Sequence, residues 1–401
     1  MTGPEGLRHG NVTDSNARPG SASRLAEVPG GPAELPASAP LPAPARVPEG
    51  GIRYREVDPA WRSADPERAS ALARFLKRLD RAATSALVRT VARFYLRKPD
   101  VAELVAFKIR DLRAVRRAFL NEAAFRLGRV RSHRLTSVNL EITNACNLAC
   151  TMCPVNTTMR RPKRMMPFSL FQRLLDENPD LDFVLPFQWG EPMLHKDFFR
   201  MVAYARSKGI RVMATTNGTL LGDDGAMERL ASCGLERITF SSDGVGETHT
   251  RIRGYAFERL RADVERFRQV RDRVGSPTCI DISMVVMDPT AADREALHES
   301  WRGVADRIQF IPLLTEGRRE RPCREPWRGS IVVLADGTVT ACCADPEGKL
   351  ALGDATRQSL REIWNGERMA ELRRRHAQRD FPDPCADCDE FESEGVSKRF
   401  G

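Results

Sequence analysis

Two hydrophobic patterns alternate along residues 137–315. Six short β-like runs predict strands: SVNLEIT, FVLPFQW, IRVMATT, ERITFSS, IDISMVV and DRIQFIP. Between them, helices are predicted near residues 168–177, 196–208, 224–232, 256–273 and 291–301. Strands that alternate with helices form parallel sheets, so these six steps predict an α/β fold, an open, partial (β/α)6 barrel similar to a TIM barrel. The reactive groups of such barrels lie on the loops after the carboxyl ends of the strands.

The flanking regions have different patterns. Residues 1–50 are rich in Pro, Gly, Ala and Ser, which predicts a disordered tail. Residues 51–136 predict a helical extension, because apolar residues recur at helical spacing between 66 and 127. After residue 315, the Asp336-Gly337 pair between SIVVL and TVTAC predicts a hairpin, and Ser359 with Glu362 predicts a capped helix. We therefore expect a barrel at 137–315, a small α+β domain at 316–393 and a short tail at 394–401.

Charge is concentrated in the predicted helical extension. Residues 51–136 hold 21 Lys and Arg against 9 Asp and Glu, although the whole chain has a net charge of only +9. No groove-reading or aromatic-interleaved motif accompanies the arginines, so we expect solvated helices and no nucleic-acid partner. No apolar run reaches about 18 residues, and the N-terminus has no apolar secretory segment. These features predict a cytoplasmic protein that does not enter a membrane.

The chemistry of the chain is indicated by its ten cysteines. In a large chain without secretion signals, cysteines indicate metal binding or catalysis more often than disulfides. Cys146, Cys150 and Cys153 form a CxxxCxxC motif directly after the first predicted strand. Three thiolates at this spacing can hold three corners of a cubane iron–sulfur cluster and leave one iron open. A zinc site with a remote fourth ligand and three unrelated cysteines are the alternatives, although zinc ribbons pair two CxxC knuckles instead.

With this motif in this place, residues 137–315 resemble the radical S-adenosylmethionine (SAM) superfamily. The resemblance implies a [4Fe–4S] cluster on Cys146, Cys150 and Cys153, with the amino and carboxylate groups of SAM on the open iron. One electron would then cleave SAM to methionine and a 5′-deoxyadenosyl radical, which abstracts hydrogen from the substrate. An electron donor such as flavodoxin or ferredoxin is implied as a partner.

Further motifs of this resemblance fall at the ends of the predicted strands. Gly190-Glu191-Pro192 follows the second strand and resembles the element that meets the SAM amino group. The remaining SAM-binding candidates are Asn217, Ser242, Asp243 and Arg253. Each also has an ordinary interpretation, as a turn residue or a surface arginine. His195, beside the second strand, is expected to pack or to begin a helix.

A second set of cysteines, Cys323, Cys342, Cys385 and Cys388, lies after the barrel. Their spacing resembles the SPASM/twitch auxiliary domain of radical SAM enzymes, which implies a second, fully ligated [4Fe–4S] cluster. A Cys₄ zinc ribbon is the alternative. No cysteine follows Cys388, which favours a single auxiliary cluster.

Three cysteines remain outside these two sets. Cys343 adjoins Cys342, but neighbours on a strand point to opposite faces, and the position after the hairpin favours Cys342 as the ligand. Cys233 and Cys279 stand alone and are expected to be small buried hydrophobic residues.

These features predict a radical SAM oxidoreductase acting on a small molecule or a peptide. The leading hypothesis is oxidation of an alcohol of a sugar or aminocyclitol, with the auxiliary cluster accepting the second electron. The alternatives are a maturase of a ribosomally made peptide, a redox-neutral sugar epimerase or dehydratase, and a zinc-stabilised, non-enzymatic binding protein. No acid, base or hydrogen donor can be nominated from the sequence, and the oligomeric state is open.

Overall fold

A computed structural model describes residues 112–313, 318–388 and 397–399 of the 401-residue chain. All of these belong to one compact unit, Lys77–Gly401. The predicted tail at 1–50 and residues 51–111 of the predicted extension lie outside the described residues. Of that extension, the structure describes helix α3 (Leu112–Arg126) and the segment that leads from it into the barrel.

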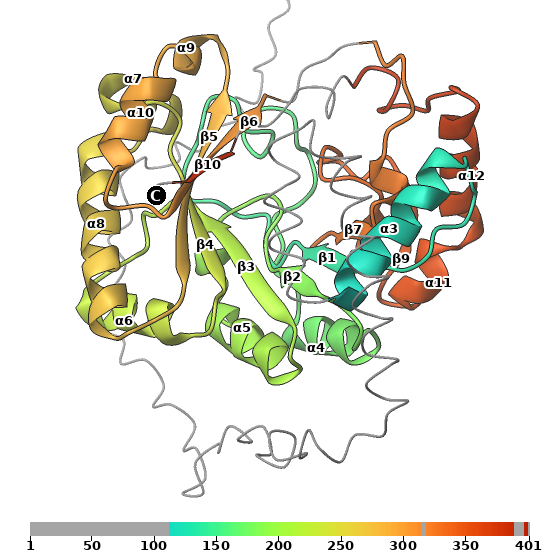
Figure 1. Ribbon diagram of the computed structural model, residues 1–401, viewed down its shortest axis with the longest axis horizontal. Helices are drawn as coiled ribbons and strands as arrows, with labels where there is room; N and C mark the ends of the chain where they lie inside the picture. The colour runs from blue at the N-terminus through green and yellow to red at the C-terminus, as the bar shows by residue number, and fades with distance from the viewer. Residues whose placement is uncertain (1–111, 314–317, 389–396, 400–401) are drawn as a thin grey trace, which may run out of the picture. The chain divides into compact units, whose positions relative to one another are not determined.

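A ten-stranded sheet runs through the described residues, in the order β10-β6-β5-β4-β3-β2-β1-β7-β8-β9 (Figure 1). Strands β1 to β6 pair in sequence order and are all parallel. They are β1 (Ser137–Leu140), β2 (Phe183–Leu185), β3 (Arg211–Thr216), β4 (Arg237–Ser241), β5 (Cys279–Val286) and β6 (Arg307–Pro312). The six predicted strands and the predicted partial barrel are confirmed.

Helices follow these strands and lie along the outside of the sheet (Figure 1). They are α4 (Phe168–Asp176), α5 (Phe198–Ser207), α6 (Asp224–Ser232), α7 (Gly246–Arg253), α8 (Phe257–Arg273), α9 (Asp288–Ala291) and α10 (Arg294–Trp301), with a short 3₁₀ turn η2 (Pro192–Leu194) after β2. The five predicted helices correspond to α4, α5, α6, α8 and α10. The hydrophobic pattern of the sequence did not predict α7, because this helix has too few apolar residues to show a helical period.

The alternation of side chains along each strand separates the two faces of the sheet. One face packs beneath the helices in the apolar core, to which neighbouring strands contribute pairs such as Ile238 with Phe240 and Ile280 with Ile282. The other face is polar, and the register brings Thr239 opposite Asp281. This polar face lines the concave side of the barrel, which we call the lumen.

The barrel stays open because other strands pair with both of its edges. β10 (Ser397–Arg399) pairs with β6 in the antiparallel direction. β7 (Ser330–Val333) pairs with β1 in the parallel direction and continues the sheet into β8 (Thr338–Thr340) and β9 (Ala351–Asp354). The predicted hairpin is therefore β7–β8, and it is joined directly to the first barrel strand.

The C-terminal region is completed by the 3₁₀ turn η3 (Glu325–Trp327), α11 (Leu360–Trp364) and α12 (Glu367–Ala377), which gather near α3 (Figure 1). Helix α11 begins where predicted. The Ser359 hydroxyl accepts a hydrogen bond from the Glu362 backbone N–H, and the Glu362 side chain accepts one from the Ser359 N–H. This reciprocal pair is a capping box.

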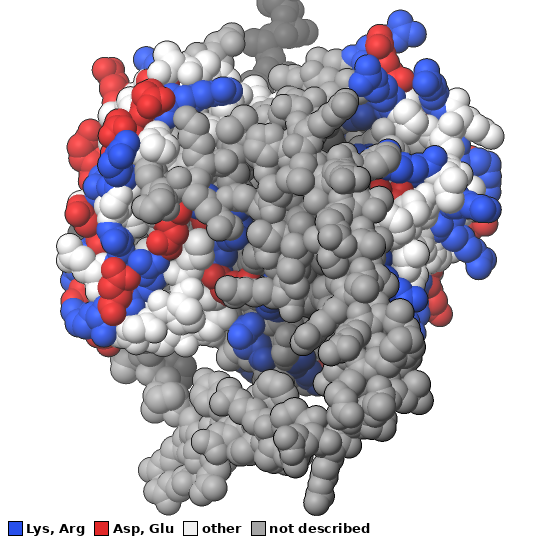
Figure 2. All heavy atoms as spheres, viewed as in Figure 1, with Lys and Arg blue, Asp and Glu red and all other residues white. Residues whose placement is uncertain are grey.

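Surface charges on the outer helices are mostly paired with one another. Figure 2 shows basic and acidic side chains interspersed over the side of the molecule formed by α8 and α10. Pairs such as Arg261–Glu265, at 2.9 Å, and Arg302–Glu299, at 2.6 Å, account for this mixture. Within the described ranges, no helix combines the length and the apolar character that crossing a bilayer requires.

Candidate functional site

The three cysteines of the CxxxCxxC motif lie on the long loop that follows β1. The loop turns tightly here, since the Cys153 backbone N–H donates to the Cys150 carbonyl at 3.1 Å and the Leu148 N–H donates to Cys146 Sγ at 3.5 Å. The Lys163 ammonium donates to the carbonyls of Asn144, at 3.2 Å, and Val155, at 3.3 Å, and so ties the two ends of the motif together. The thiols are thus held on one short, cross-braced segment at the carboxyl edge of the sheet.

Gly190 and Glu191, which follow β2, pack closely against this loop. A Cβ on Gly190 would lie 2.6 Å from the Thr143 carbonyl oxygen and 2.7 Å from that of Ala145, so only glycine allows this approach. The Glu191 N–H donates to the Ala145 carbonyl at 2.8 Å. Pro192 follows at the start of η2 and is buried. The Gly-Glu-Pro element therefore abuts the residue that precedes Cys146.

The Glu191 carboxylate joins this element to the end of β3. It accepts hydrogen bonds from the Asn217 N–H at 2.7 Å, the Thr216 hydroxyl at 2.8 Å and the Met193 N–H at 3.0 Å. Asn217 in turn directs its Nδ2 toward Cys146 Sγ, at 3.8 Å, and donates to the Asn147 side chain at 2.9 Å. Glu191 is 1% exposed and fully engaged, so its role in this geometry is to position Asn217.

The ends of β4 and α7 supply the remaining predicted side chains. Asp243 accepts a hydrogen bond from Arg253 Nε at 2.8 Å and one from the Val285 N–H at 2.7 Å. The Thr151 N–H, between two of the cysteines, donates to the Ile252 carbonyl at 3.0 Å, next to Arg253. Among the described residues, no group pairs with the terminal nitrogens of Arg253, so they are available to a ligand. Ser242 lies deeper and contacts the buried ring of His249 at 3.4 Å.

The electrostatics of the trio favour neutral thiols when no metal is bound. Burial raises the pKa of Cys150 to about 11, against which the charge of Arg253 acts in the opposite direction. Burial also raises the pKa of Cys146 and of Cys153. Metal binding therefore has to displace protons, and the nearby guanidinium of Arg253 favours the thiolate forms.

The second cysteine set surrounds a small cavity of about 40 Å³ in the C-terminal region. Its lining includes Cys323, Cys342, Cys385 and Cys388, which come from three separate segments, and it does not include Cys343. Burial raises the pKa of Cys323 to about 12 and of Cys385 to about 11. Cys342 thus lines the cavity with the other three, but β8 ends at Thr340, before both cysteines, so strand alternation does not decide between them and the choice of Cys342 as ligand stays a prediction.

In neither cysteine set do three sulfurs lie within 4.8 Å of one another. A tetrahedral zinc with Zn–S bonds of about 2.3 Å brings its sulfurs to about 3.8 Å from one another. Among the described residues, the only group of three or more ligand atoms within 4.8 Å of one another is Glu295, His298 and Glu299. The number of thiols in each set, three and four, suits a three-ligand and a four-ligand iron–sulfur cluster.

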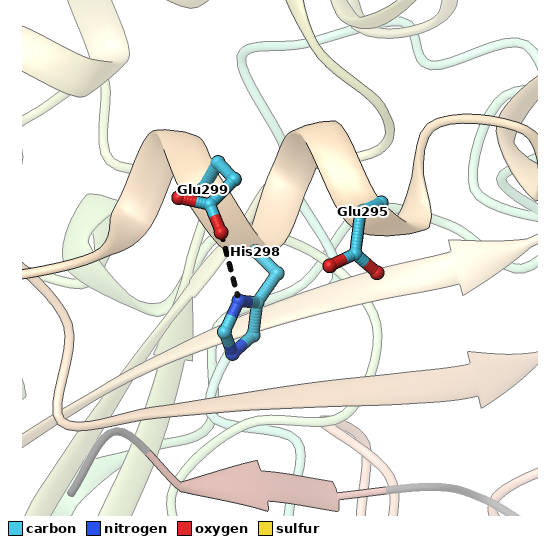
Figure 3. Close-up of side chains that lie close together, drawn as sticks. All are labelled: Glu295, His298 and Glu299. Carbon is cyan, nitrogen blue, oxygen red and sulfur yellow. Dashed lines mark ion pairs between the residues drawn. The ribbon is translucent and has the colours of Figure 1, made fainter.

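The group of Glu295, His298 and Glu299 on α10 belongs to the surface on which acidic and basic side chains pair. Figure 3 shows the three side chains extending from one helix, with an ion pair of 3.9 Å between His298 Nδ1 and Glu299. Glu299 also pairs with Arg302 at 2.6 Å. We assign no metal to this group.

The lumen contains a polar cluster centred on Asp281 of β5. Its fully buried carboxylate accepts hydrogen bonds from Gln309 Nε2 at 2.6 Å and Arg307 Nε at 3.1 Å, and Arg237 Nε lies at 3.2 Å. The Cys279 thiol donates to the same carboxylate at 3.3 Å. The expectation that Cys279 is a buried hydrophobic residue is therefore wrong, because strand alternation turns it into the lumen. Cys233, in contrast, packs against the apolar core as expected.

The structure brings the predicted residues of the rim together around the trio. His195 caps η2 and contacts the Met166 carbonyl at 3.0 Å, in the structural role expected of it. Sequence reasoning missed Asn147, His249 and Arg319. Arg319 donates to Cys388 Sγ at 3.3 Å. Proximity to a motif in sequence could have indicated Asn147, but no local pattern marks the other two.

Comparison with known families identifies two regions of the chain. Residues 140–299 match the model of the radical SAM superfamily, and residues 323–389 match SPASM, an iron–sulfur cluster-binding domain. These two domains imply two [4Fe–4S] clusters and SAM as cofactors. The predicted boundaries at 137 and 315–316 stay predictions.

Similar proteins span several activities. An AdoMet-dependent heme synthase of Methanosarcina barkeri is 35% identical over 133 residues, 32% of this chain and 38% of that protein. A PqqA peptide cyclase of Xanthomonas axonopodis pv. citri is 29% identical over 215 residues, 51% of this chain and 55% of that protein. Each match thus spans only about a third to a half of the curated relative.

Among solved structures, Streptococcus suis SuiB bound to the precursor peptide SuiA is similar in fold. The TM-score is 0.52 at 14% identity, with 65% of this chain and 71% of that chain covered. The family matches, the cysteine motifs and this fold agree. Residues 140–299 therefore belong to the radical SAM superfamily, and residues 323–389 to the SPASM family of iron–sulfur cluster-binding domains.

Proposed function

We propose that the chain abstracts a hydrogen atom from a polar substrate in the lumen and completes a two-electron oxidation with its auxiliary site as electron acceptor. The main support for this proposal is that the cysteines of the chain form two separate sets. The trio at the end of β1 has three thiols, whereas four thiols surround the C-terminal cavity. Three ligands leave an iron open for SAM, and four leave none, which suits electron transfer.

In this proposal Cys146, Cys150 and Cys153 hold the first cluster. When bound there, the cluster and SAM supply the one-electron cleavage that yields methionine and a 5′-deoxyadenosyl radical. Asn217 and the backbone of Gly190 fix the rim on which SAM lies, and the unpaired end of Arg253 meets the SAM carboxylate. Glu191 and Asp243 orient these groups, because their own oxygens are taken up by protein donors. Ser242 and Pro192 shape the same rim.

The substrate proposal rests on the lumen. Asp281, Gln309 and the arginines around them form a hydrogen-bonding floor. Ser283 lies further along β5 toward the rim, opposite Gln309 in the register. Because the Asp281 carboxylate is buried and already bonded, the polar side chains nearer the rim, such as Ser283, would meet the substrate, and they suit a ligand with hydroxyl or amino groups, such as a sugar or aminocyclitol whose alcohol is oxidised to a ketone. The alcohol carbon loses a hydrogen atom to the 5′-deoxyadenosyl radical, and the resulting radical then loses one proton to solvent and one electron to the site of Cys323, Cys342, Cys385 and Cys388.

Peptide modification is the second candidate. The 215 residues matched by the PqqA peptide cyclase exceed the length of the radical SAM match at 140–299, so the likeness extends beyond that domain. A polar lumen also suits a peptide backbone. In either case, a flavodoxin or ferredoxin would supply the electron for SAM cleavage.

Anaerobic purification followed by product analysis tests the proposal. We expect brown protein with about eight irons per chain, as two cubanes require. With reductant, SAM and a panel of aminocyclitols and sugars, we expect one 5′-deoxyadenosine per product and a product that has lost two hydrogen atoms. A product of unchanged mass would contradict the oxidation, and the same mass loss on a precursor peptide instead would establish the second candidate. Colourless protein that contains zinc would refute both.

A further inference from the structure

Arg319 lies in the wall of the C-terminal cavity. It is one of the residues that line this cavity together with the four cysteines, and only 7% of its surface is exposed. No motif points to it, and it lies four residues before Cys323. Its side chain is nevertheless directed at the other end of the site, the Cys385–Cys388 turn.

Three hydrogen bonds hold Arg319 on that turn, and a fourth joins it to Arg321. Its Nη2 donates to Cys388 Sγ at 3.3 Å, and its Nε donates to the Cys385 carbonyl at 3.2 Å. Its backbone N–H donates to the Ala386 carbonyl at 2.9 Å, and Nη1 reaches the Arg321 carbonyl at 3.5 Å. The main chain and the side chain of Arg319 both bond to this turn. The guanidinium therefore cannot move away without breaking hydrogen bonds of the segment that carries Cys385 and Cys388.

The buried charge of Arg319 faces a cysteine sulfur and, within the described part of the chain, no paired carboxylate. A buried guanidinium is costly unless a counter-charge faces it. Arg161 and Arg253 pair with Glu141 and Asp243, but among the described residues no carboxylate pairs with Arg319. Its guanidinium instead faces the Cys388 sulfur and the Cys385 carbonyl.

A second buried arginine shows that this arrangement is specific to the cysteine site. Arg373 also lacks a carboxylate partner among the described residues, but it faces the carbonyls of Pro326 and Val130 and stacks on Trp364, 4.4 Å from the ring centroid. The two buried arginines therefore differ in what they face, backbone carbonyls and an aromatic ring for Arg373 and a cysteine sulfur for Arg319.

We infer that Arg319 is a positioning residue that raises the reduction potential of the auxiliary cluster by placing a fixed positive charge and an N–H donor on the sulfur of Cys388. Reduction adds one electron and one negative charge to the cluster, so a neighbouring cation favours the reduced state, and hydrogen bonds to sulfur act in the same direction. The residue thereby makes the site a better acceptor for the electron that a substrate radical gives up. This inference rests on the proposed function, since it requires the auxiliary cluster.

The test measures the potential of that cluster alone. In a full-length C146A/C150A/C153A background, reconstituted anaerobically, the remaining electron paramagnetic resonance signal belongs to the auxiliary site, and a redox titration gives its midpoint. We expect Arg319→Met to lower the equilibrium constant for reduction about tenfold, which is about 59 mV for one electron. Arg319→Lys keeps the charge but loses the planar guanidinium. Its midpoint potential should lie between that of the parent and that of Arg319→Met.

The control is Arg324→Met. Arg324 adjoins Cys323, and the substitution removes the same charge, but its guanidinium pairs with Glu122 at 2.6 Å on the surface, where solvent screens it. Its midpoint should equal that of the parent. A midpoint unmoved in Arg319→Met, or moved equally by Arg324→Met, overturns the inference. Where Arg319→Met fails to retain iron, Arg319→Gln takes its place with the same criterion. Absence of iron from the triple-cysteine parent would instead refute the auxiliary cluster and the proposed function with it.

Discussion

The guanidinium of Arg161 donates two parallel hydrogen bonds to the buried carboxylate of Glu141, at 2.9 Å from Nη1 and 2.8 Å from Nη2. Glu141 directly follows β1, and its Oε1 also accepts from the Ala335 N–H at 3.1 Å, in the turn between β7 and β8. Arg161 lies after the cysteine trio, and its Nε donates to the Pro346 carbonyl at 2.6 Å, shortly after Cys342. This pair therefore joins the loops that carry the two cysteine sets to the first barrel strand.

Breaking this pair should destabilise the fold strongly. Arg161→Met leaves the Glu141 carboxylate buried without its partner, a change that typically costs about 3–5 kcal/mol. Denaturation by urea, followed by circular dichroism, would measure the loss. The control is Arg160→Met, because Arg160 is exposed and contacts Glu347 through its backbone N–H, which the substitution keeps. A loss of unfolding free energy below about 1 kcal/mol in Arg161→Met would contradict this role of the Arg161–Glu141 pair, since a loss of that size is the ordinary effect of a surface pair.

The barrel could be predicted from sequence because its signals are local. Strands β3 and β5 carry enough alternating or continuous apolar residues to mark them, and the Ser359–Glu362 capping box fixes the start of α11 within one turn. Both cysteine sets are also visible as spacings. In each case the residues that determine the structure lie within a few positions of one another.

The features that could not be predicted depend on long-range pairing. Nothing near Ser330 indicates that β7 joins β1, a pairing that unites the barrel and the C-terminal region in a continuous sheet. An isolated cysteine is usually buried, which places Cys279 in the core, whereas its face is set by the register with neighbouring strands. Likewise, Arg319 reaches Cys388 across 69 positions, so only the folded chain brings them together.

The two cysteine sets should be separable by their iron content. Replacing Cys146, Cys150 and Cys153 with alanine should leave about four irons per chain and abolish SAM cleavage. Cys342→Ala should retain SAM cleavage but lose the auxiliary cluster, because Cys342 lines the cavity and Cys343 does not. Iron analysis and 5′-deoxyadenosine formation measure both effects.

Cys343→Ala is the matched control for this assignment. It should keep about eight irons, as should Cys233→Ala, whose thiol donates to the Leu230 carbonyl at 3.0 Å away from both sets. Loss of the auxiliary cluster from Cys343→Ala, with Cys342→Ala intact, would reverse the ligand assignment.

Glu191→Gln should weaken SAM binding without loss of iron. The amide nitrogen that replaces one oxygen carries N–H groups, and these would face the N–H donor of either Met193 or Asn217. Losing one such charged, buried hydrogen bond costs about 1.5–3 kcal/mol, so we expect SAM to bind about 10- to 100-fold more weakly if Asn217 is displaced. Equilibrium dialysis of SAM under anaerobic conditions measures this. Glu177→Gln, which removes an exposed pair with Arg173, is the control, and equal affinities in the two variants would refute the positioning role.

His249 should make the stability of the fold depend on pH in the acid range. Burial, followed by the charge of Arg253, lowers the pKa of His249 to about 3, whereas the unfolded chain titrates at its ordinary value of 6.5. Between these values the unfolded state binds one proton more than the folded state. The contribution of His249 is therefore complete above pH 6.5 and declines as the pH falls, by about 1.4 kcal/mol per pH unit. His376, whose pKa burial lowers to about 4, adds to the same slope in the parent.

His249→Gln cannot titrate, so its free energy of unfolding, measured by denaturation from pH 6.5 to pH 4.5, should fall less steeply than that of the parent. Parallel curves would mean that His249 is protonated in the folded state, and the site would then carry a second positive charge beside Arg253.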